Sequence, residues 1–338
     1  MLENKKTMER ICPACNHKKA IIRNIYNIKD AYDRLPLPKP TSEAIFYSYL
    51  TTLWGGDQAE FLECQNCKLC YANPFIPANE FHYNLIYKSD EGYSKWSWEF
   101  ELTYNHLENM KKDDPTYEMN ILEIGAGNGS FIKKTSSITQ KEKILTIEYS
   151  SYAKEQLEKF GLKCEQKSFM EIDSDLYKDS FDAVCMFHVL EHMNDLNELF
   201  IRIAKITKKN GFLFISIPNN RHQELFERYD FFEDVPPIHI SRWNRKSLEI
   251  AARMGGFQLE DYQIESTNRF LNLKKYYSIY RRSKFKKLKN NLIRKSINRS
   301  LFMVMFFTRL KNVFSILQKD LGKSQWVCLK KIQTKIIK

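Results

Sequence analysis

Two pairs of cysteines stand at the spacing with which proteins bind metal ions. The pairs are Cys12 with Cys15, in CPAC, and Cys64 with Cys67, in CQNCKLC. Two C-x-x-C turns supply four thiolates, which bind zinc tetrahedrally and leave no coordination position open for a substrate. We therefore predict a structural zinc site. The alternatives are a site in which Cys70 or His17 replaces one thiolate, and buried cysteines without metal.

A glycine-rich turn is the second stretch that could do chemistry. In ILEIGAGNGSF the glycines are Gly125, Gly127 and Gly129. A strand that leads through such a turn into a helix presents backbone N–H groups, to which nucleotide cofactors bind. The dinucleotide fingerprint would need a glycine at Ser130, and a P-loop would need a lysine after Gly129, so neither pattern fits. What remains is E-x-G-x-G-x-G, which begins at Glu123.

Three separated stretches in this order resemble the class I S-adenosylmethionine (SAM)-dependent methyltransferases, of the ubiquinone/menaquinone-methyltransferase-like type. The glycine turn is the first, and the second is Glu148 in LTIEYS, where an acid can accept both ribose hydroxyls. The third is FDAVCMFHVLEHMND followed by KKNGFLFISIPN, the fourth and fifth strands of that family. The resemblance covers roughly residues 119–265. It implies SAM as the cofactor and a seven-stranded sheet whose last strand is antiparallel.

The resemblance also implies which residues contact the cofactor, at the carboxyl ends of the strands. They are Glu123, Gly125, Gly127 and Gly129 for the methionine part, Glu148 for the ribose, Ser168 and Phe169 for the adenine, and Phe187 and His188 beside the cofactor. A plain strand-to-helix turn with no ligand is the alternative for the glycines.

The cofactor residues stand at the ends of predicted strands that alternate with predicted helices. Strands are predicted at 119–126, 143–149, 162–166, 181–187, 212–218, 258–265 and 324–331. Helices are predicted after Gly129 and at 151–161, 195–209 and 242–257. This alternation predicts a doubly wound α/β fold, with a Rossmann-like sheet that helices cover on both faces.

Composition and the order of the motifs divide the chain into five predicted parts. They are a zinc-binding domain (1–78), an aromatic helical lid or linker (79–118), the SAM-binding core (119–265), a basic helical insertion (266–323), and the last core strand with a tail (324–338). In sugar methyltransferases with a similar layout the aromatic helix folds over the cofactor, which would make Tyr87 and Tyr93 part of a lid. Ordinary packing of these tyrosines is the alternative.

Four histidines are candidates for the general base: His239, His188, His192 and His222, of which His222 is expected to be only solvated in the polar loop NNRHQ. His239 stands in VPPIHISRW, where alternation points Ile238 and Ile240 one way and the imidazole the other. A neutral imidazole can accept a hydroxyl proton near pH 7. The segment resembles H-x-x-x-[FW]-[TN]-x-x-S-L of sugar methyltransferases, in which the histidine is a proposed base. A loop histidine that only ties down backbone is the alternative.

The predicted acceptor is a sugar hydroxyl, in a nucleotide-linked sugar or a surface glycan. The C-x-x-C…C-x-x-C-x-x-x-Y-x-N-P layout resembles bacterial sugar methyltransferases, and the strand exit Phe187-His188-Val189-Leu190 lacks the Asn/Asp-Pro-Pro-aromatic loop of nucleobase amine methylation. One alternative is an RNA methyltransferase whose knuckle and basic arm hold RNA. The other is a non-catalytic module that binds SAM and zinc.

Charge is divided unevenly along the chain. Residues 266–338 carry 20 Lys/Arg and one acid, which leaves −7 of the overall +12 for the first 265 residues. The body is therefore not a general polyanion binder. The basic arm at 269–321 suits either an anionic membrane surface or a helical cover over the substrate cleft. Without a signal peptide or an apolar run near 20 residues, we expect a cytoplasmic protein, with a peripheral place at the inner membrane face left open by the arm.

Overall fold

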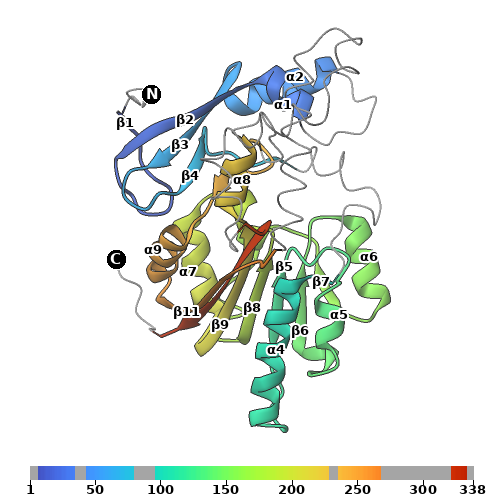
Figure 1. Ribbon diagram of the computed structural model, residues 1–338. Helices are drawn as coiled ribbons and strands as arrows, with labels where there is room; N and C mark the ends of the chain where they lie inside the picture. Colours follow the sequence, from blue (N-terminus) through green and yellow to red (C-terminus); the bar gives the residue numbers. More distant parts are fainter. Residues whose placement is uncertain (1–6, 35–42, 80–95, 228–234, 268–320, 333–338) are drawn as a thin grey trace, which may run out of the picture.

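The computed structural model describes residues 7–34, 43–79, 96–227, 235–267 and 321–332 (Figure 1). Its strands are β1 (Thr7–Glu9), β2 (Lys19–Asn27), β3 (Gln58–Cys64), β4 (Cys70–Asn73), β5 (Ile121–Ile124), β6 (Ile144–Ile147), β7 (Lys163–Glu165), β8 (Phe181–Phe187), β9 (Thr207–Pro218), β10 (Ser241–Arg242), β11 (Phe257–Ile264) and β12 (Ser324–Lys331). Its helices are α1 (Ile28–Arg34), α2 (Glu43–Trp54), α4 (Trp98–Asp113), α5 (Ile132–Thr135), α6 (Ser151–Lys159), α7 (Leu196–Ile206), α8 (Asn220–Glu227), α9 (Arg245–Met254) and the short η2 (Lys141–Lys143), η3 (Phe169–Glu171) and η4 (Leu190–His192). Almost all of the predicted basic arm, and both Tyr87 and Tyr93, lie outside the described residues, so the membrane and lid hypotheses stay predictions.

The larger sheet has seven strands in the order β11-β12-β9-β8-β5-β6-β7. The five strands from β9 to β7 are parallel, whereas β12 pairs antiparallel with both β9 and β11. This confirms the predicted α/β sheet, including the antiparallel last strand. The carboxyl ends of β5 and β8 lie side by side at the point where the strand order reverses, which is where α/β sheets bind ligands.

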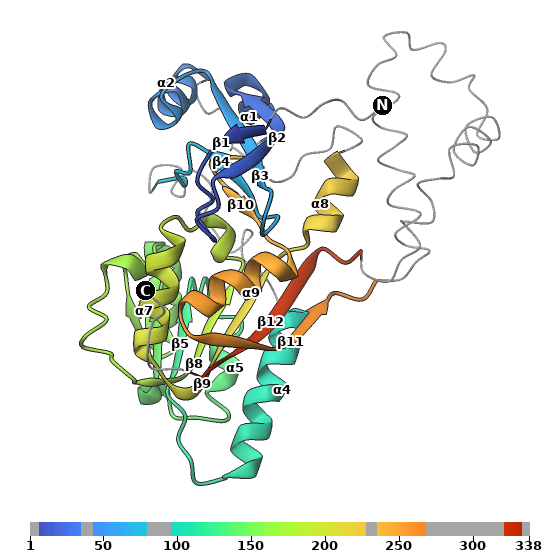
Figure 2. The same cartoon turned by 90° about the vertical axis from the view of Figure 1, so that its left-hand side faces the viewer.

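Each face of this sheet is buried by its own helices. Alternate side chains of the strands pack with α7 and α9 on one face and with α4, α5 and α6 on the other (Figures 1 and 2). Leu122 and Ile124 of β5 belong to the first core, and Ile121 to the second. The two-residue alternation of a strand therefore leaves Glu123 facing the α4 side, beneath the glycine turn.

One predicted helix is too long. It was expected over 195–209, but α7 ends at Ile206 because Thr207 already pairs with Phe181 in the sheet. The next regular pair is Ala183 with Phe212, so the residues between form a bulge in β9, with Asn210 at a φ of 63°. The helix predicted at 242–257 likewise shortens to α9, which begins after an Asn244 cap.

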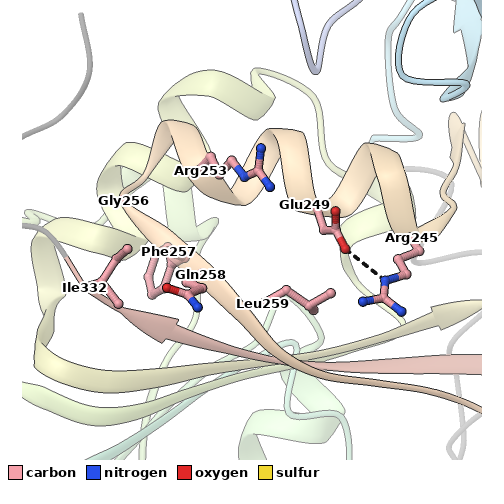
Figure 3. A pocket seen from close by; sticks show the side chains of 8 residues that line it. All are labelled: Arg245, Glu249, Arg253, Gly256, Phe257, Gln258, Leu259 and Ile332. Carbon is pink, nitrogen blue, oxygen red and sulfur yellow. Dashed lines mark hydrogen bonds and ion pairs between the residues drawn. The ribbon is translucent and has the colours of Figure 1, made fainter.

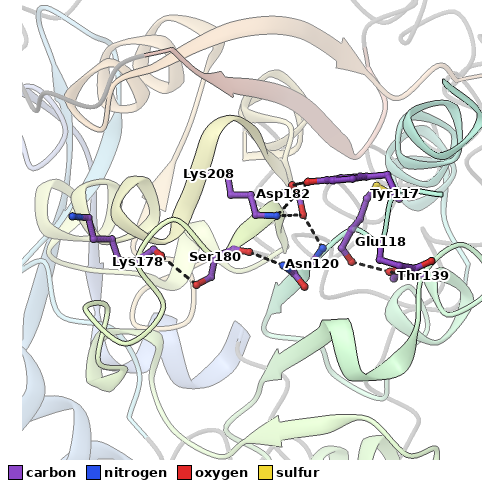
Figure 4. A network of polar contacts seen from close by, with 9 residues as sticks. Tyr117, Glu118, Asn120, Thr139, Lys178, Ser180, Asp182 and Lys208 are labelled. Atoms are coloured by element: carbon purple, nitrogen blue, oxygen red, sulfur yellow. Dashed lines mark hydrogen bonds and ion pairs between the residues drawn. The ribbon is translucent and has the colours of Figure 1, made fainter. Parts of the chain in front are cut away.

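A buried carboxylate joins three segments at the amino ends of the strands, opposite the glycine turn (Figure 4). Asp182 of β8 accepts hydrogen bonds from the Asn120 backbone N–H (2.8 Å) and the Tyr117 hydroxyl (2.6 Å). Its Oδ2 also lies 2.8 Å from Nζ of Lys208. The network therefore links the chain entering β5 to β8 and to the bulge of β9.

Replacing Asp182 with alanine is expected to lower the free energy of unfolding by about 2–3 kcal/mol. Losing one partner of a fully buried ion pair costs about 3–5 kcal/mol, and the Lys208 side chain is 31% exposed, which reduces the loss. Urea denaturation measures it. Asp175→Ala, which removes an exposed ion pair with Lys205, is the control and should leave the midpoint unchanged. Equal midpoints for the two variants would show that the network does not stabilise the sheet.

The smaller sheet has five strands in the order β1-β2-β3-β4-β10, and α1 and α2 pack against it. Its last strand comes from far along the chain, since Ser241 pairs with Tyr71 and Arg242 with Cys70. The Ala72 N–H also donates to the Ile240 carbonyl, at 2.8 Å. The N-terminal unit therefore holds the loop that precedes α9, and with it His239. The predicted domain boundaries stay predictions.

Candidate active site

The two C-x-x-C turns have the same backbone geometry. Asn16 donates to the Cys12 carbonyl at 3.0 Å, and Lys68 donates to the Cys64 carbonyl at 3.1 Å. Asn16 and Lys68 both take left-handed conformations, with φ of 57° and 64°. The matching turns bring Cys12 Sγ within 3.6 Å of Cys67 Sγ, with the other two sulfurs beside them.

The four sulfurs have the arrangement of a tetrahedral metal site. All lie within 4.8 Å of one another, and Cys15 Sγ is 3.5 Å from Cys64 Sγ. A disulfide would need about 2.05 Å, whereas thiolates around an ion with bonds of about 2.3 Å lie about 3.8 Å apart. The donor set therefore fits a closed four-thiolate site. Cys70 and His17, the alternative ligands, are not in the cluster.

The cysteine cluster is also docked onto the methyltransferase-like sheet. Cys12, Cys64 and Cys67 are fully buried and belong to the same core as α7 and α9. Asn244, the cap of α9, donates through Nδ2 to the Lys68 carbonyl at 2.8 Å. The second C-x-x-C turn thus contacts the start of α9 and also leads directly into β4.

The glycine turn has a backbone conformation that favours glycine at each of its three positions. Gly125, Gly127 and Gly129 have φ of 71°, 53° and 81°, the left-handed region that other residues rarely adopt. A Cβ on Gly125 would collide with Cγ2 of Val189, and one on Gly129 would lie 2.7 Å from Cδ2 of Leu157. The turn therefore brings the backbone close to the exit of β8 and leaves no room for a side chain at Gly125 or Gly129.

Two carboxylates flank this turn. Glu148 accepts the Gly127 N–H (2.7 Å) through Oε2, and the N–H groups of Tyr149 (2.8 Å) and Ser150 (3.1 Å) through Oε1. Glu123 is 2% exposed, and its Oε2 has no hydrogen-bond partner in the described part of the chain. Burial, helped by nearby Glu148, raises the pKa of Glu123 well above its usual value. The orphaned oxygen fits SAM, whose methionine part carries an ammonium donor.

Glu148→Ala is expected to weaken SAM binding by roughly 1.5–3 kcal/mol, the scale of hydrogen bonds to a charged group. Part of this loss comes from the Gly127 N–H, which the carboxylate holds in place. Isothermal calorimetry measures the affinity, with Glu155→Ala, on the surface of α6, as the control. An affinity within twofold of the wild type would remove Glu148 from the cofactor site.

The structure accounts for three other predicted cofactor residues without a ligand. Ser168 caps η3 in a reciprocal pair with Glu171, and Phe169 is buried in the main core. Phe187 packs edge-on against Phe100 and Phe131, both with ring centroids 4.8 Å away. The predicted contacts of Ser168 and Phe169 with adenine, and the predicted place of Phe187 beside the cofactor, stay predictions.

His188 follows β8 and lies between two buried carboxylates. Its Nε2 is 3.3 Å from Glu99 Oε1, its Nδ1 is 3.4 Å from Glu191 Oε1, and Ser324 Oγ lies 3.4 Å from Nε2. Burial lowers the pKa of His188, but hydrogen bonds with Glu191 and Glu99 outweigh it and raise the pKa to about 10. A protonated imidazole donates hydrogen bonds and cannot accept a proton, which argues against His188 as the general base.

His192 and His239 lie together at the carboxyl side of the sheet. Their ring centroids are 4.6 Å apart with the planes at 71°. His192 Nδ1 is 2.6 Å from the Ile238 carbonyl, and the Ile240 N–H donates to the Glu191 carbonyl at 3.0 Å. These two bonds pin the residues on either side of His239 to η4. Burial and the neighbouring His239 lower the pKa of His192 to about 4.

The residues that match the sequence motif around His239 have distinct roles. Asn244 and Ser247 form a capping box at the start of α9, while Trp243 and Leu248 are fully buried. Four of the five motif positions therefore start or pack a helix. His239 is the one left for chemistry, and Ile240 packs into the core of the N-terminal sheet on the other side, as alternation predicted.

The sequence analysis missed three buried polar residues here. Glu99 and Glu191 are 4% and 1% exposed, and Ser216, which pairs with Phe187 in the sheet, is fully buried. Each has a side-chain oxygen without a hydrogen-bond partner among the described residues, which is rare in native cores. An acid inside the aromatic run WSWEFEL was the available signal for Glu99.

A separate pocket of about 430 Å³ lies between α9 and the edge strand β11 (Figure 3). Arg245 and Glu249 pair across its rim at 2.9 Å, and Phe257, Leu259 and Ile332 form its apolar side. None of the predicted cofactor or catalytic residues lines it. It is therefore not the candidate active site.

Comparison with known proteins now identifies the class. Residues 102–262 match the family model of a methyltransferase domain. The match covers 161 of the 338 residues. With the sheet order, the glycine turn and Glu148, it shows that the protein is an enzyme that contains a class I SAM-dependent methyltransferase domain. No curated protein matches the chain.

Solved structures with a similar fold are distant in sequence. A SAM-dependent methyltransferase from Archaeoglobus fulgidus is 17% identical with a TM-score of 0.45, covering 69% of this chain and 94% of that one. One from Mesorhizobium loti is 11% identical with a TM-score of 0.43, covering 67% and 96%. Phosphoethanolamine N-methyltransferase 2 from Haemonchus contortus, in complex with phosphomonomethylethanolamine and S-adenosylhomocysteine, is 18% identical with a TM-score of 0.41, covering 75% and 57%.

No helix in the described ranges combines the length and the apolar character needed to cross a membrane.

Proposed function

We propose that the enzyme transfers the methyl group of SAM to a sugar hydroxyl, in a nucleotide-linked sugar or a surface glycan. The observation that carries the proposal is the position of His239. Its loop is paired to β4 of the N-terminal sheet and pinned to η4 directly after β8. This brings an imidazole to the carboxyl side of the sheet, where the cofactor turn also opens.

The proposed chemistry is an in-line displacement at the sulfonium carbon. SAM supplies the electrophile, the bond from sulfur to methyl breaks as the bond from oxygen to methyl forms, and neutral S-adenosylhomocysteine leaves. The protein supplies alignment and a base for the hydroxyl proton. His239 is that base, since the raised pKa of His188 keeps its imidazole protonated and the pKa of His192, lowered to about 4 by burial and by His239, makes His192 a weak base.

The charge of the site favours a sugar over RNA as the acceptor. Glu99, Glu148 and Glu191 gather near the exits of β6 and β8, with His188 between two of them. Carboxylates repel the phosphates of a polyanion, whereas they accept hydrogen bonds from hydroxyl groups. The net negative charge of residues 1–265 also disfavours binding of RNA.

Transfer of a labelled methyl group tests the acceptor class. Purified enzyme is incubated with methyl-labelled SAM and, in parallel, with a panel of nucleotide-linked sugars, a surface-glycan extract and total RNA. The proposal expects label on sugar oxygen in the first or second arm, identified by mass spectrometry after hydrolysis. Label in RNA, with none on sugars, would overturn it in favour of the RNA alternative.

We also propose that the four clustered cysteines hold a structural zinc ion. Thiol modification should release one zinc per chain from this cluster, as measured with a chelating dye. Cys12→Ser should lose that zinc and lower the thermal midpoint, because structural zinc contributes directly to folding energy. Cys164→Ser, outside the cluster, is the control and should keep it. A folded N-terminal sheet with no zinc released on modification would contradict the assignment.

Loss of this zinc should also slow catalysis, because it should change the position of the loop that carries His239. β4 begins three residues after Cys67 and pairs with β10, two residues after His239. A loosened cysteine cluster is therefore expected to displace the His239 loop while the glycine turn keeps its shape.

A further inference from the structure

We infer that Glu191, His192 and His239 bind one divalent transition-metal ion, at a second site distinct from the four cysteines. The three side chains offer a carboxylate oxygen and two imidazole nitrogens that all lie within 4.8 Å of one another. Metal–ligand bonds of about 2.1 Å join donors that lie within about 4.2 Å. Side-chain movements of less than about an ångström would therefore bring the three donor atoms to the separations that a bound metal ion needs.

The charge balance around Glu191 supports a cation there. Glu191 is 1% exposed, and apart from its ion pair with His188 neither of its oxygens has a hydrogen-bond partner among the residues described. His188 also faces Glu99, which is 4% exposed. One imidazole, which carries at most one positive charge, thus faces two buried carboxyl groups, and burying the remaining negative charge is costly unless another positive group compensates it.

The orientation of His192 is that of a metal ligand. Its Nδ1 lies 2.6 Å from the Ile238 carbonyl, which can only accept, so Nδ1 carries the proton and Nε2 carries the lone pair. Histidines that ligate metals almost always donate their other N–H to a carbonyl or carboxylate in this way. The bond from the Ile240 N–H to the Glu191 carbonyl holds the third ligand, His239, against the other two.

The donor set indicates the class of metal. Two imidazoles and one carboxylate suit zinc, iron or another first-row transition metal, whereas magnesium and calcium prefer oxygen ligands alone. Three protein ligands leave a coordination position open, as catalytic sites do.

The role of the open coordination position on the metal ion rests on the proposed function. The acceptor hydroxyl would bind there, and the metal would lower its pKa so that its proton passes to solvent. With the ion bound, His239 would act on the acceptor hydroxyl through that ion, and with the ion removed it would accept the proton directly, as proposed above. Metal binding itself does not depend on the identity of the acceptor.

Cobalt(II) spectroscopy tests the site, because thiolate and imidazole–carboxylate coordination give different spectra. Full-length protein with its cysteine cluster filled is treated with a mild chelator and titrated with cobalt(II). We expect one equivalent to bind, with weak visible ligand-field bands and no intense near-ultraviolet thiolate charge-transfer band. His192→Ala and Glu191→Gln should lose that equivalent, and His106→Gln, on α4, should keep it.

Two results would overturn the inference. One is a wild-type protein that shows no visible bands in the titration, which needs no variant to fold. The other is binding that His192→Ala and Glu191→Gln both leave unchanged. The spectra are recorded without substrate, so they are independent of the labelling assay. If cobalt binds while the label enters RNA, the proposed acceptor fails and the metal site stands.

Discussion

Gly127→Asp is expected to abolish SAM binding, lowering affinity at least about 100-fold while the protein stays folded. The residue has a φ of 53° in the centre of the turn, and its N–H is held by Glu148. An aspartate would add a side chain where the cofactor must approach the backbone, and a negative charge beside Glu148. The loss of hydrogen bonds to charged groups, at about 1.5–3 kcal/mol each, accounts for this size.

Gly55→Asp is the matched control for the cost of the backbone conformation. Gly55 has a φ of 67°, and a Cβ there would meet nothing within 4 Å. Both variants carry an aspartate in the left-handed region, but only Gly127→Asp alters the turn after β5. Calorimetric affinity near the wild-type value in a folded Gly127→Asp protein would show that the cofactor binds elsewhere.

His239→Ala is expected to lower kcat by about 10²–10⁴, the usual contribution of a positioned proton acceptor or of the group that replaces it. SAM affinity should stay unchanged, since the glycine turn and Glu148 are on other elements. The rate is measured with the sugar acceptor at saturating SAM. His106→Gln is the control, because His106 packs on Phe212 and Phe214 away from the cluster.

A loss of less than tenfold in a folded His239→Ala protein would contradict this role. In that case His192 would accept the hydroxyl proton, or the transfer would need no base from the protein. Because Trp243, Asn244, Ser247 and Leu248 remain in place to start and pack α9, the variant should keep the wild-type thermal midpoint.

The parts of the fold that depend on local pattern were predictable from the sequence. The strand over 181–187 and the strand over 324–331 match β8 and β12 residue for residue, because each is a short apolar run with clear limits. The glycine turn was predictable for the same reason, since three glycines in five positions directly after an apolar strand favour positive φ, which the structure shows at all three.

The pairing of β10 with β4 was not predictable. Residues 241–242 form a two-residue strand about 170 positions from their partner in β4, and a segment so short carries no alternation of its own. The end of α7 was missed because strand pairing of Thr207 overrode a helical pattern that continues through Lys209.

The candidate site shows the same division. His239 was found from its motif, but Glu99 meets His188 across 89 positions of sequence, and only the fold brings them together. Glu191 was quoted within FHVLEH without a role, because its burial between three histidines depends on the distant 235–242 loop.

A crystal structure of the full-length protein with S-adenosylhomocysteine tests the central claim most directly. The account predicts the ribose hydroxyls on Glu148, the homocysteine part over Gly125–Gly129 with its ammonium toward Glu123, and the sulfur facing the Glu191–His192–His239 cluster. A cofactor bound away from the turn after β5, or a sulfur turned away from that cluster, would contradict it.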